Sequence, residues 1–172
     1  MSNISRIKNL SLTLKIKGFS YIEILATVAI LALLATAAVP YFDLIQKRQK
    51  ESELRHNLRL IRDAIDAYKK ASDEGRIINA VGDSGYPKRL EDLTSGIGDD
   101  NDTAHRKLFF LRRLPRDPMA ISNTSGDVSA AQTWRLRSYD SPPNQPQEGS
   151  DVFDVYSSSD QKGLDGVPYS QW

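Results

Sequence analysis

The stretch Lys17-Gly18-Phe19-Ser20-Tyr21-Ile22-Glu23 leads into an apolar run that continues almost without interruption from Ile24 to Phe42. Glu23 is the only acidic or basic side chain in residues 19–42. A helix over these residues would rise about 36 Å, which is enough to cross the hydrocarbon core of a bilayer. The sequence therefore predicts a single membrane-spanning helix over residues 19–42.

A basic leader, residues 1–18, precedes the apolar run and contains no acidic residue. Its basic residues are Arg6, Lys8, Lys15 and Lys17. The whole chain of 172 residues has 23 basic and 22 acidic side chains, so loss of the leader would leave 19 basic and 22 acidic, a net charge near −3. This asymmetry is typical of a leader that stays in the cytoplasm while the body crosses the membrane.

A cleaved secretory signal is the alternative interpretation of the apolar run. Ala35-Thr36-Ala37-Ala38 would offer the small residues that a signal peptidase needs. The run is nevertheless longer than the roughly 7–15 apolar residues of a typical signal peptide.

Glu23 favours the membrane-spanning interpretation. A carboxylate inside a membrane segment costs a few kcal/mol on insertion scales, so it persists where another group compensates the cost. Cleavage between Gly18 and Phe19 would create an α-ammonium group one helical turn from Glu23. In a medium of low dielectric constant the amine of a neighbouring subunit would attract this carboxylate strongly, although both groups must first be desolvated.

The residues Gly18-Phe19-Ser20-Tyr21-Ile22-Glu23 resemble the processing motif of the type IV pilin and type II secretion pseudopilin superfamily. The resemblance implies that a prepilin peptidase in the inner membrane cuts after Gly18 and methylates the new amino terminus of Phe19. It also implies that Glu23 guides subunit packing and that Pro40 is a helix-loosening proline.

A second, amphipathic helix pattern follows in residues 43–71, which we interpret as a stem. Its apolar stripe recurs at spacings of four, three, four and three: Leu54, Leu58, Ile61, Ile65 and Tyr68. Charged residues fill the other faces, as expected for a solvated helix surface. Gly75 is the predicted stop signal.

Residues 72–172 are predicted to form a compact head. Two strands are expected at residues 133–139 and 151–156, because apolar and polar side chains alternate there between turn formers. The proline-rich residues 141–146 between them must form a loop. Short helices are expected at residues 88–93 and 103–114, with a flexible acidic turn at 96–102. The predicted fold class is α+β, in which a long N-terminal helix packs on a small C-terminal antiparallel sheet, as in pilins.

The head also carries a weaker resemblance. The chain has no cysteine, whereas type IV pilins usually close this region with a disulfide. Four segments look like the head of the major, G-type pseudopilin of type II secretion. They are Leu114-Pro115-Arg116-Asp117-Pro118, Trp134, Asp154-Val155-Tyr156-Ser157 and residues 160–172.

Calcium is the one metal that the sequence suggests. Oxygen-bearing side chains and glycines gather between Asp154 and Gly166, and G-type pseudopilins hold calcium in their C-terminal loop. Asp160 and Asp165 are the expected side-chain ligands. The segment does not match the EF-hand spacing, and a polar turn in which Asp and Ser cap their own backbone is the alternative.

Other chemistries are not supported by the sequence. His56 and His105 are too far apart along the chain to suggest a metal pair. No G-x-S-x-G motif occurs, so we expect no enzymatic activity. The basic cluster Arg112, Arg113 and Arg116 lacks interleaved aromatic residues, which favours a subunit contact or a solvated loop over nucleic-acid binding.

Together these features predict a structural subunit that is anchored in the bacterial inner membrane with its head in the periplasm. It would form a homopolymer with the help of prepilin peptidase, other pseudopilins and the assembly platform of the secretion system. Filament growth would drive protein export. The alternatives are a type IV pilus subunit for adhesion, motility or DNA uptake, and a membrane-tethered periplasmic binding domain or enzyme that never polymerises.

Overall fold

The computed structural model describes residues 18–104, 106–120 and 128–172, with the backbone alone at 37–40. The chain divides into two compact units, Met1–Asp43 and Leu44–Trp172. One long helix, α1 (Tyr21–Asp73), contributes residues to both units. The second unit adds small antiparallel sheets, so the predicted α+β class is confirmed.

Local sequence signals set both ends of α1. The helix begins at Tyr21, two residues later than the predicted start at Phe19. At its other end Gly75 has a φ of 71°, and the Arg76 and Gly75 amides donate to the carbonyls of Ala71 (2.9 Å) and Ser72 (3.0 Å). This pair of bonds is a Schellman motif, which a glycine accommodates without strain. Gly75 therefore ends the helix as predicted.

The second half of α1 carries the main core. All five residues of the predicted apolar stripe are buried, and Leu54 and Ile61 are completely inaccessible to solvent. They pack in one cluster with Leu90, Leu93, Trp134, Val152, Val155 and Tyr169. The periodicity of the sequence therefore identified the face of α1 that meets the rest of the head.

The two predicted C-terminal strands exist but are shorter than expected. β3 (Trp134–Arg137) pairs antiparallel with β4 (Asp154–Ser157), with Trp134 opposite Ser157 and Arg137 opposite Asp154. Thr133 belongs instead to a 3₁₀ turn, η1 (Ala131–Thr133). At the other end the Ser138 and Val152 amides bond outside the strand pair, to the carbonyls of Gln147 and Pro87. The connecting residues 141–146 form a loop, as predicted.

The predictions for residues 88–114 were largely wrong. The only α-helix among residues 88–104 and 106–114 is α2 (Asp92–Ser95), later and shorter than the predicted 88–93. β1 (Ile97–Gly98), inside the predicted acidic turn, pairs with β2 (Lys107–Leu108), where a helix over 103–114 was expected. The cause is tertiary, because the Phe110 and Leu111 amides both donate to the Leu93 carbonyl instead of to a helix of their own.

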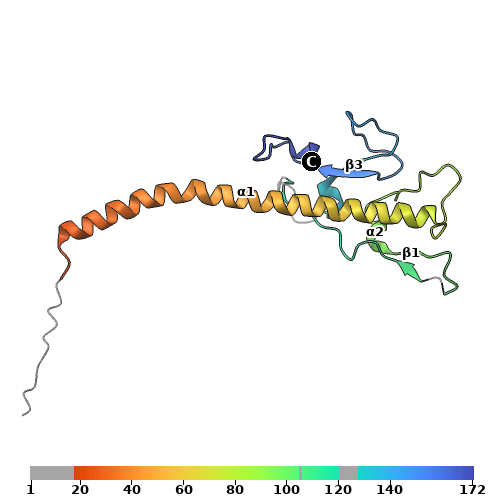
Figure 1. The fold of residues 1–172 in the computed structure, drawn as a ribbon, viewed down its shortest axis with the longest axis horizontal. Coiled ribbons are helices and arrows are strands. Elements are labelled where there is room, and N and C mark those ends of the chain that lie inside the picture. Colours follow the sequence, from red (N-terminus) through yellow and green to blue (C-terminus); the bar gives the residue numbers. More distant parts are fainter. Residues whose placement is uncertain (1–17, 105, 121–127) are drawn as a thin grey trace, which may run out of the picture. The chain divides into compact units, whose positions relative to one another are not determined.

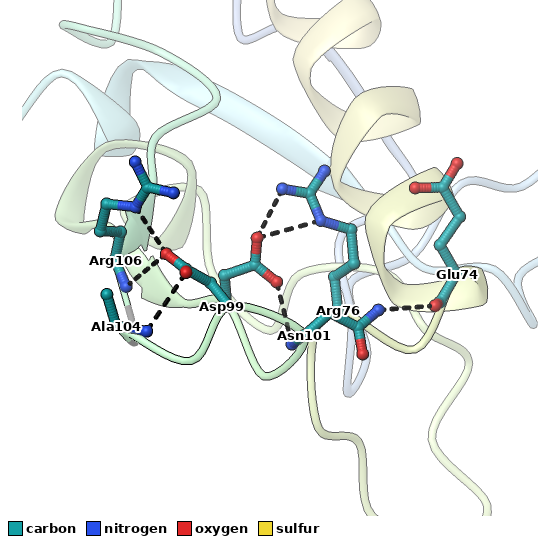
Figure 2. Close-up of polar contacts among 7 residues, drawn as sticks. Glu74, Arg76, Asp99, Asn101, Ala104 and Arg106 are labelled. Carbon is teal, nitrogen blue, oxygen red and sulfur yellow. Dashed lines mark hydrogen bonds and ion pairs between the residues drawn. The ribbon is translucent and has the colours of Figure 1, made fainter.

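The hairpin of β1 and β2 is tied to the end of α1 by a buried carboxylate. Arg76 donates to Asp99 Oδ2 through Nη2 (2.6 Å) and Nε (3.1 Å), and the Asn101 amide donates to Asp99 Oδ1, as Figure 2 shows. On the neighbouring turn Ala104 and Arg106 donate to Asp102. Figure 1 shows this hairpin and β3 on opposite sides of the second half of α1.

Candidate processing and assembly site

Gly18, Phe19 and Ser20 lie outside any regular element, directly before α1. All three are exposed, and the side chain of Phe19 is 78% accessible to solvent. A Cβ atom placed on Gly18 would meet nothing within 4 Å. A protease needs a peptide bond that is accessible and not engaged in a helix, and the Gly18–Phe19 bond meets both conditions.

Ser20 and Glu23 make one half of a capping box at the start of α1. The Glu23 amide donates to the Ser20 carbonyl (3.0 Å), and the Ser20 amide donates to Glu23 Oε2 at 3.4 Å. The Glu23 carboxylate thereby accepts from one backbone donor, the Ser20 amide, at the start of the helix. A carboxylate in the first turn also interacts favourably with the helix dipole. Glu23 therefore has a role within its own chain, which the sequence analysis missed although Ser-x-x-Glu is its signature.

The first half of α1 is long and apolar enough to cross a membrane, and its most apolar window is entirely unburied. Large side chains such as Ile22, Val28, Leu33 and Phe42 are each more than half exposed. The hydroxyls of Thr27 and Thr36 donate to the carbonyls of Ile24 (2.8 Å) and Leu33 (2.7 Å) of the same helix. These polar groups are therefore satisfied without water, as a lipid environment requires.

Pro40 lies inside α1 and does not end it. Proline removes one backbone donor and crowds the preceding turn, so the helix lacks one of its internal hydrogen bonds at this point. The role of Pro40 in loosening the helix stays a prediction.

The two carboxylates predicted to bind calcium pair with different arginines. Asp160 Oδ1 accepts from Arg135 Nη1 at 3.3 Å, and its side chain is 82% exposed. Asp165 Oδ2 accepts from Arg55 Nη2 at 3.1 Å, and Asp165 Oδ1 accepts from the Val167 amide at 3.0 Å. In the part of the chain that the structure describes, no three His, Cys, Asp or Glu side chains gather as a metal site would require. In this arrangement the residues do not fit a calcium ion.

Asp117 in the head and Glu51 on α1 are buried carboxylates that the sequence did not single out. Asp117 Oδ2 accepts from the Ser157 hydroxyl (2.7 Å) and the Ser158 amide (3.1 Å), and its Oδ1 accepts from the Met119 amide. Asp117 thereby fastens the end of β4 to the Leu114–Pro118 segment. Glu51 Oε1 accepts from the Leu164 amide and the Tyr169 hydroxyl, and so fastens the C-terminal residues to α1. The signal that could have found Glu51 is its place on the predicted stem helix beside the apolar stripe.

The remaining predicted residues that the structure describes lie at the surface. Arg112, Arg113 and Arg116 are exposed, and their side chains make no hydrogen bond or ion pair to another described residue. His56 is exposed on α1, and His105 lies outside the described residues. Their roles stay predictions.

Comparisons with known proteins do not assign the chain. No protein-family model matches it, and no curated protein or solved structure is detectably similar to it.

Proposed function

We propose that this protein is the structural subunit of a type II secretion pseudopilus, most like the major, G-type pseudopilin. Prepilin peptidase cuts it between Gly18 and Phe19 and methylates Phe19. The first half of α1 anchors the subunit in the bacterial inner membrane, the head lies in the periplasm, and copies polymerise to drive protein export. The subunit has no catalytic activity of its own.

The observation that carries this proposal is the junction at Gly18 and Phe19. The motif residues lie at an exposed, non-helical site that leads directly into an apolar helix whose large side chains are exposed. Such a surface is unfavourable in water and needs lipid or other helices to cover it. A cut at this junction leaves the anchor intact and creates an amine within one turn of Glu23.

The same geometry supports the proposed filament assembly. In the membrane, and later in the filament core, the apolar helices of neighbouring copies cover one another. The Phe19 amine of one copy pairs with Glu23 of another, which fixes how far one subunit is displaced along the next. The amine must displace only the Ser20 amide from the Glu23 carboxylate, and that contact is long and exposed.

Intact-mass spectrometry of the membrane-extracted protein tests this proposal. We expect a chain that begins at Phe19 and is heavier by one methyl group. A native protein that retains residues 1–18, or one that is cut near Ala38 and released as a soluble monomer, would contradict it. Electron microscopy then separates the related functions. A long extracellular fibre would indicate a type IV pilus subunit. A protein that does not polymerise would indicate a membrane-tethered binding domain.

A further inference from the structure

The C-terminal residues 158–172, called here the tail segment, are bound to one side of α1. The side chains that reach the tail segment come from Lys47, Glu51, Arg55 and Arg62. Their spacings of four, four and seven residues place them along one stripe of the helix. The tail segment is therefore held by a row of contacts along four turns of α1.

Glu51 is the central contact of this row. It is 8% exposed, and its Oε1 accepts hydrogen bonds from the Leu164 amide (2.8 Å) and the Tyr169 hydroxyl (2.9 Å). Tyr169 is completely buried, and burial together with the neighbouring Glu51 carboxylate raises the pKa of its hydroxyl, which stays protonated and donates. Hydrogen bonds to an ionised acceptor are stronger than those between neutral groups.

Two arginines of α1 contact Trp172 at the end of the tail segment. The guanidinium of Arg55 pairs with Asp165 and lies 4.1 Å from the centroid of the Trp172 ring. Arg62 Nη2 donates to the Trp172 carbonyl at 2.8 Å, and its Nε donates to Asp154 Oδ1 at 2.7 Å. Arg55 therefore combines an ion pair with a cation–π contact, and Arg62 combines an ion pair with a hydrogen bond to the backbone.

The turn at Gly163, within the tail segment, leaves little space for additional atoms. A Cβ atom at Gly163 would come within 2.6 Å of both Asp165 Oδ1 and the Trp172 ring. Calcium requires six to eight oxygen ligands at about 2.3–2.6 Å. In this segment the Asp165 oxygens accept from Arg55 and Val167, and Asp160 faces Arg135. The positive charge that a cation would supply is already supplied by arginine side chains.

We propose that the tail segment takes its native conformation through Glu51, Arg55 and Arg62 of α1, and needs no divalent cation. This inference concerns the folding of the head and does not depend on the proposed function. It replaces the calcium site expected from the family resemblance with side-chain contacts within the chain.

The test measures the thermal unfolding midpoint and amide hydrogen exchange of the full chain in detergent, with excess chelator and with millimolar calcium. We expect the midpoint and the slow exchange of the Leu164 and Tyr169 amides to be the same in both solutions. A rise in the midpoint, or slower exchange in the tail segment, on adding calcium would overturn the proposal, because a ligand that binds only the folded state stabilises it. This arm needs no variant.

Substitutions at Glu51 test the contacts themselves. Glu51→Ala removes the shared acceptor, and we expect faster exchange of the Leu164 and Tyr169 amides and a midpoint lower by roughly 4–8 °C or more. Glu51→Gln keeps an acceptor oxygen and should cause a smaller change. Glu53→Ala is the matched control, because Glu53 is exposed on the same helix and its side chain makes no bond to another described residue. Unchanged exchange of both amides in Glu51→Ala would contradict the proposal.

Discussion

At the scale of single residues, Glu23 has two roles that can be separated. In the subunit it accepts from the Ser20 amide and helps to start α1. In the proposed filament it pairs with the Phe19 amine of another copy. The first role needs only an acceptor oxygen, whereas the second needs a negative charge, so replacement by glutamine distinguishes them.

We predict that Glu23→Gln leaves helix formation and membrane insertion intact but sharply lowers filament yield. Glutamine can still accept from the Ser20 amide, but it carries no charge to attract an amine. Glu23→Ala should lower filament yield as well and should also weaken the helix start by about 0.3–1 kcal/mol. Filament yield is measured by shearing and immunoblotting, and helix content by circular dichroism. Normal filament yield from Glu23→Gln would mean that capping, and not charge, explains this residue.

Asp99 makes the stability of the head depend on pH. Its hydrogen bonds with Arg76 lower the pKa of the Asp99 carboxyl below its usual value of 3.8. A carboxyl whose pKa is lower in the folded state stabilises the fold above its unfolded pKa, and this contribution is lost as the pH falls through the folded value. We predict that Asp99→Asn destabilises the head at neutral pH and that its difference from the unmodified protein shrinks below about pH 4.

Denaturant midpoints at neutral pH and near pH 3 test the Asp99 prediction. Asp100→Asn is the control, because Asp100 is the exposed neighbour and its side chain makes no bond to another described residue. A difference between Asp99→Asn and the unmodified protein that stays constant with pH would show that the Arg76 contact does not depend on the charge of Asp99.

At the scale of elements, α1 changes its environment along its length while its backbone stays helical. Its first half exposes its apolar side chains, and its second half buries one stripe under the head. The stabilisation of the second half therefore comes from packing of one face, since helix propensity alone contributes little. Two leucines of this half allow the packing to be measured.

We predict that Leu54→Ala lowers the free energy of unfolding by about 2–5 kcal/mol, because it leaves a cavity in a close-packed core. Leu60→Ala is the matched control: Leu60 is on the same helix and is 37% exposed, so the cost should be below roughly 1 kcal/mol. Chemical denaturation of both variants gives the comparison. Equal costs would show that the head does not pack on this stripe.

At the scale of the whole molecule, the two units differ in what they need from their surroundings. The buried apolar residues of the described chain all lie between Leu54 and Tyr169, inside the unit Leu44–Trp172. The other unit contains the exposed apolar run. One unit therefore has its own core, and the other needs an apolar environment to cover its helix.

We predict that a fragment of residues 44–172 folds in water as a soluble monomer. It keeps the stripe of α1, the strand pair β3 and β4, and the contacts of the tail segment. Cooperative thermal unfolding and the near-ultraviolet circular dichroism of the buried Trp134 would report a native core. An aggregated or unfolded fragment would mean that the head depends on the membrane helix.

The sequence by itself determined the features that depend on local chemistry and periodicity. Local sequence predicted three features: the apolar run, the buried stripe from Leu54 to Tyr68 and the helix end at Gly75. Each depends on residues that lie within one or two helical turns of one another. The strands at β3 and β4 were also located, although not their ends.

Only the tertiary structure decided where the backbone and the carboxylates of the head find partners. Residues 103–114 had a helix-like pattern, but the Phe110 and Leu111 amides bond to Leu93 and the segment contains β2. Glu51 and Asp160 look alike as isolated acids, yet one is buried under Tyr169 and the other is exposed beside Arg135. The partners of Glu51 are more than a hundred residues away along the chain, and no local pattern specifies such contacts, because they exist only once the core has brought α1 and the tail segment together.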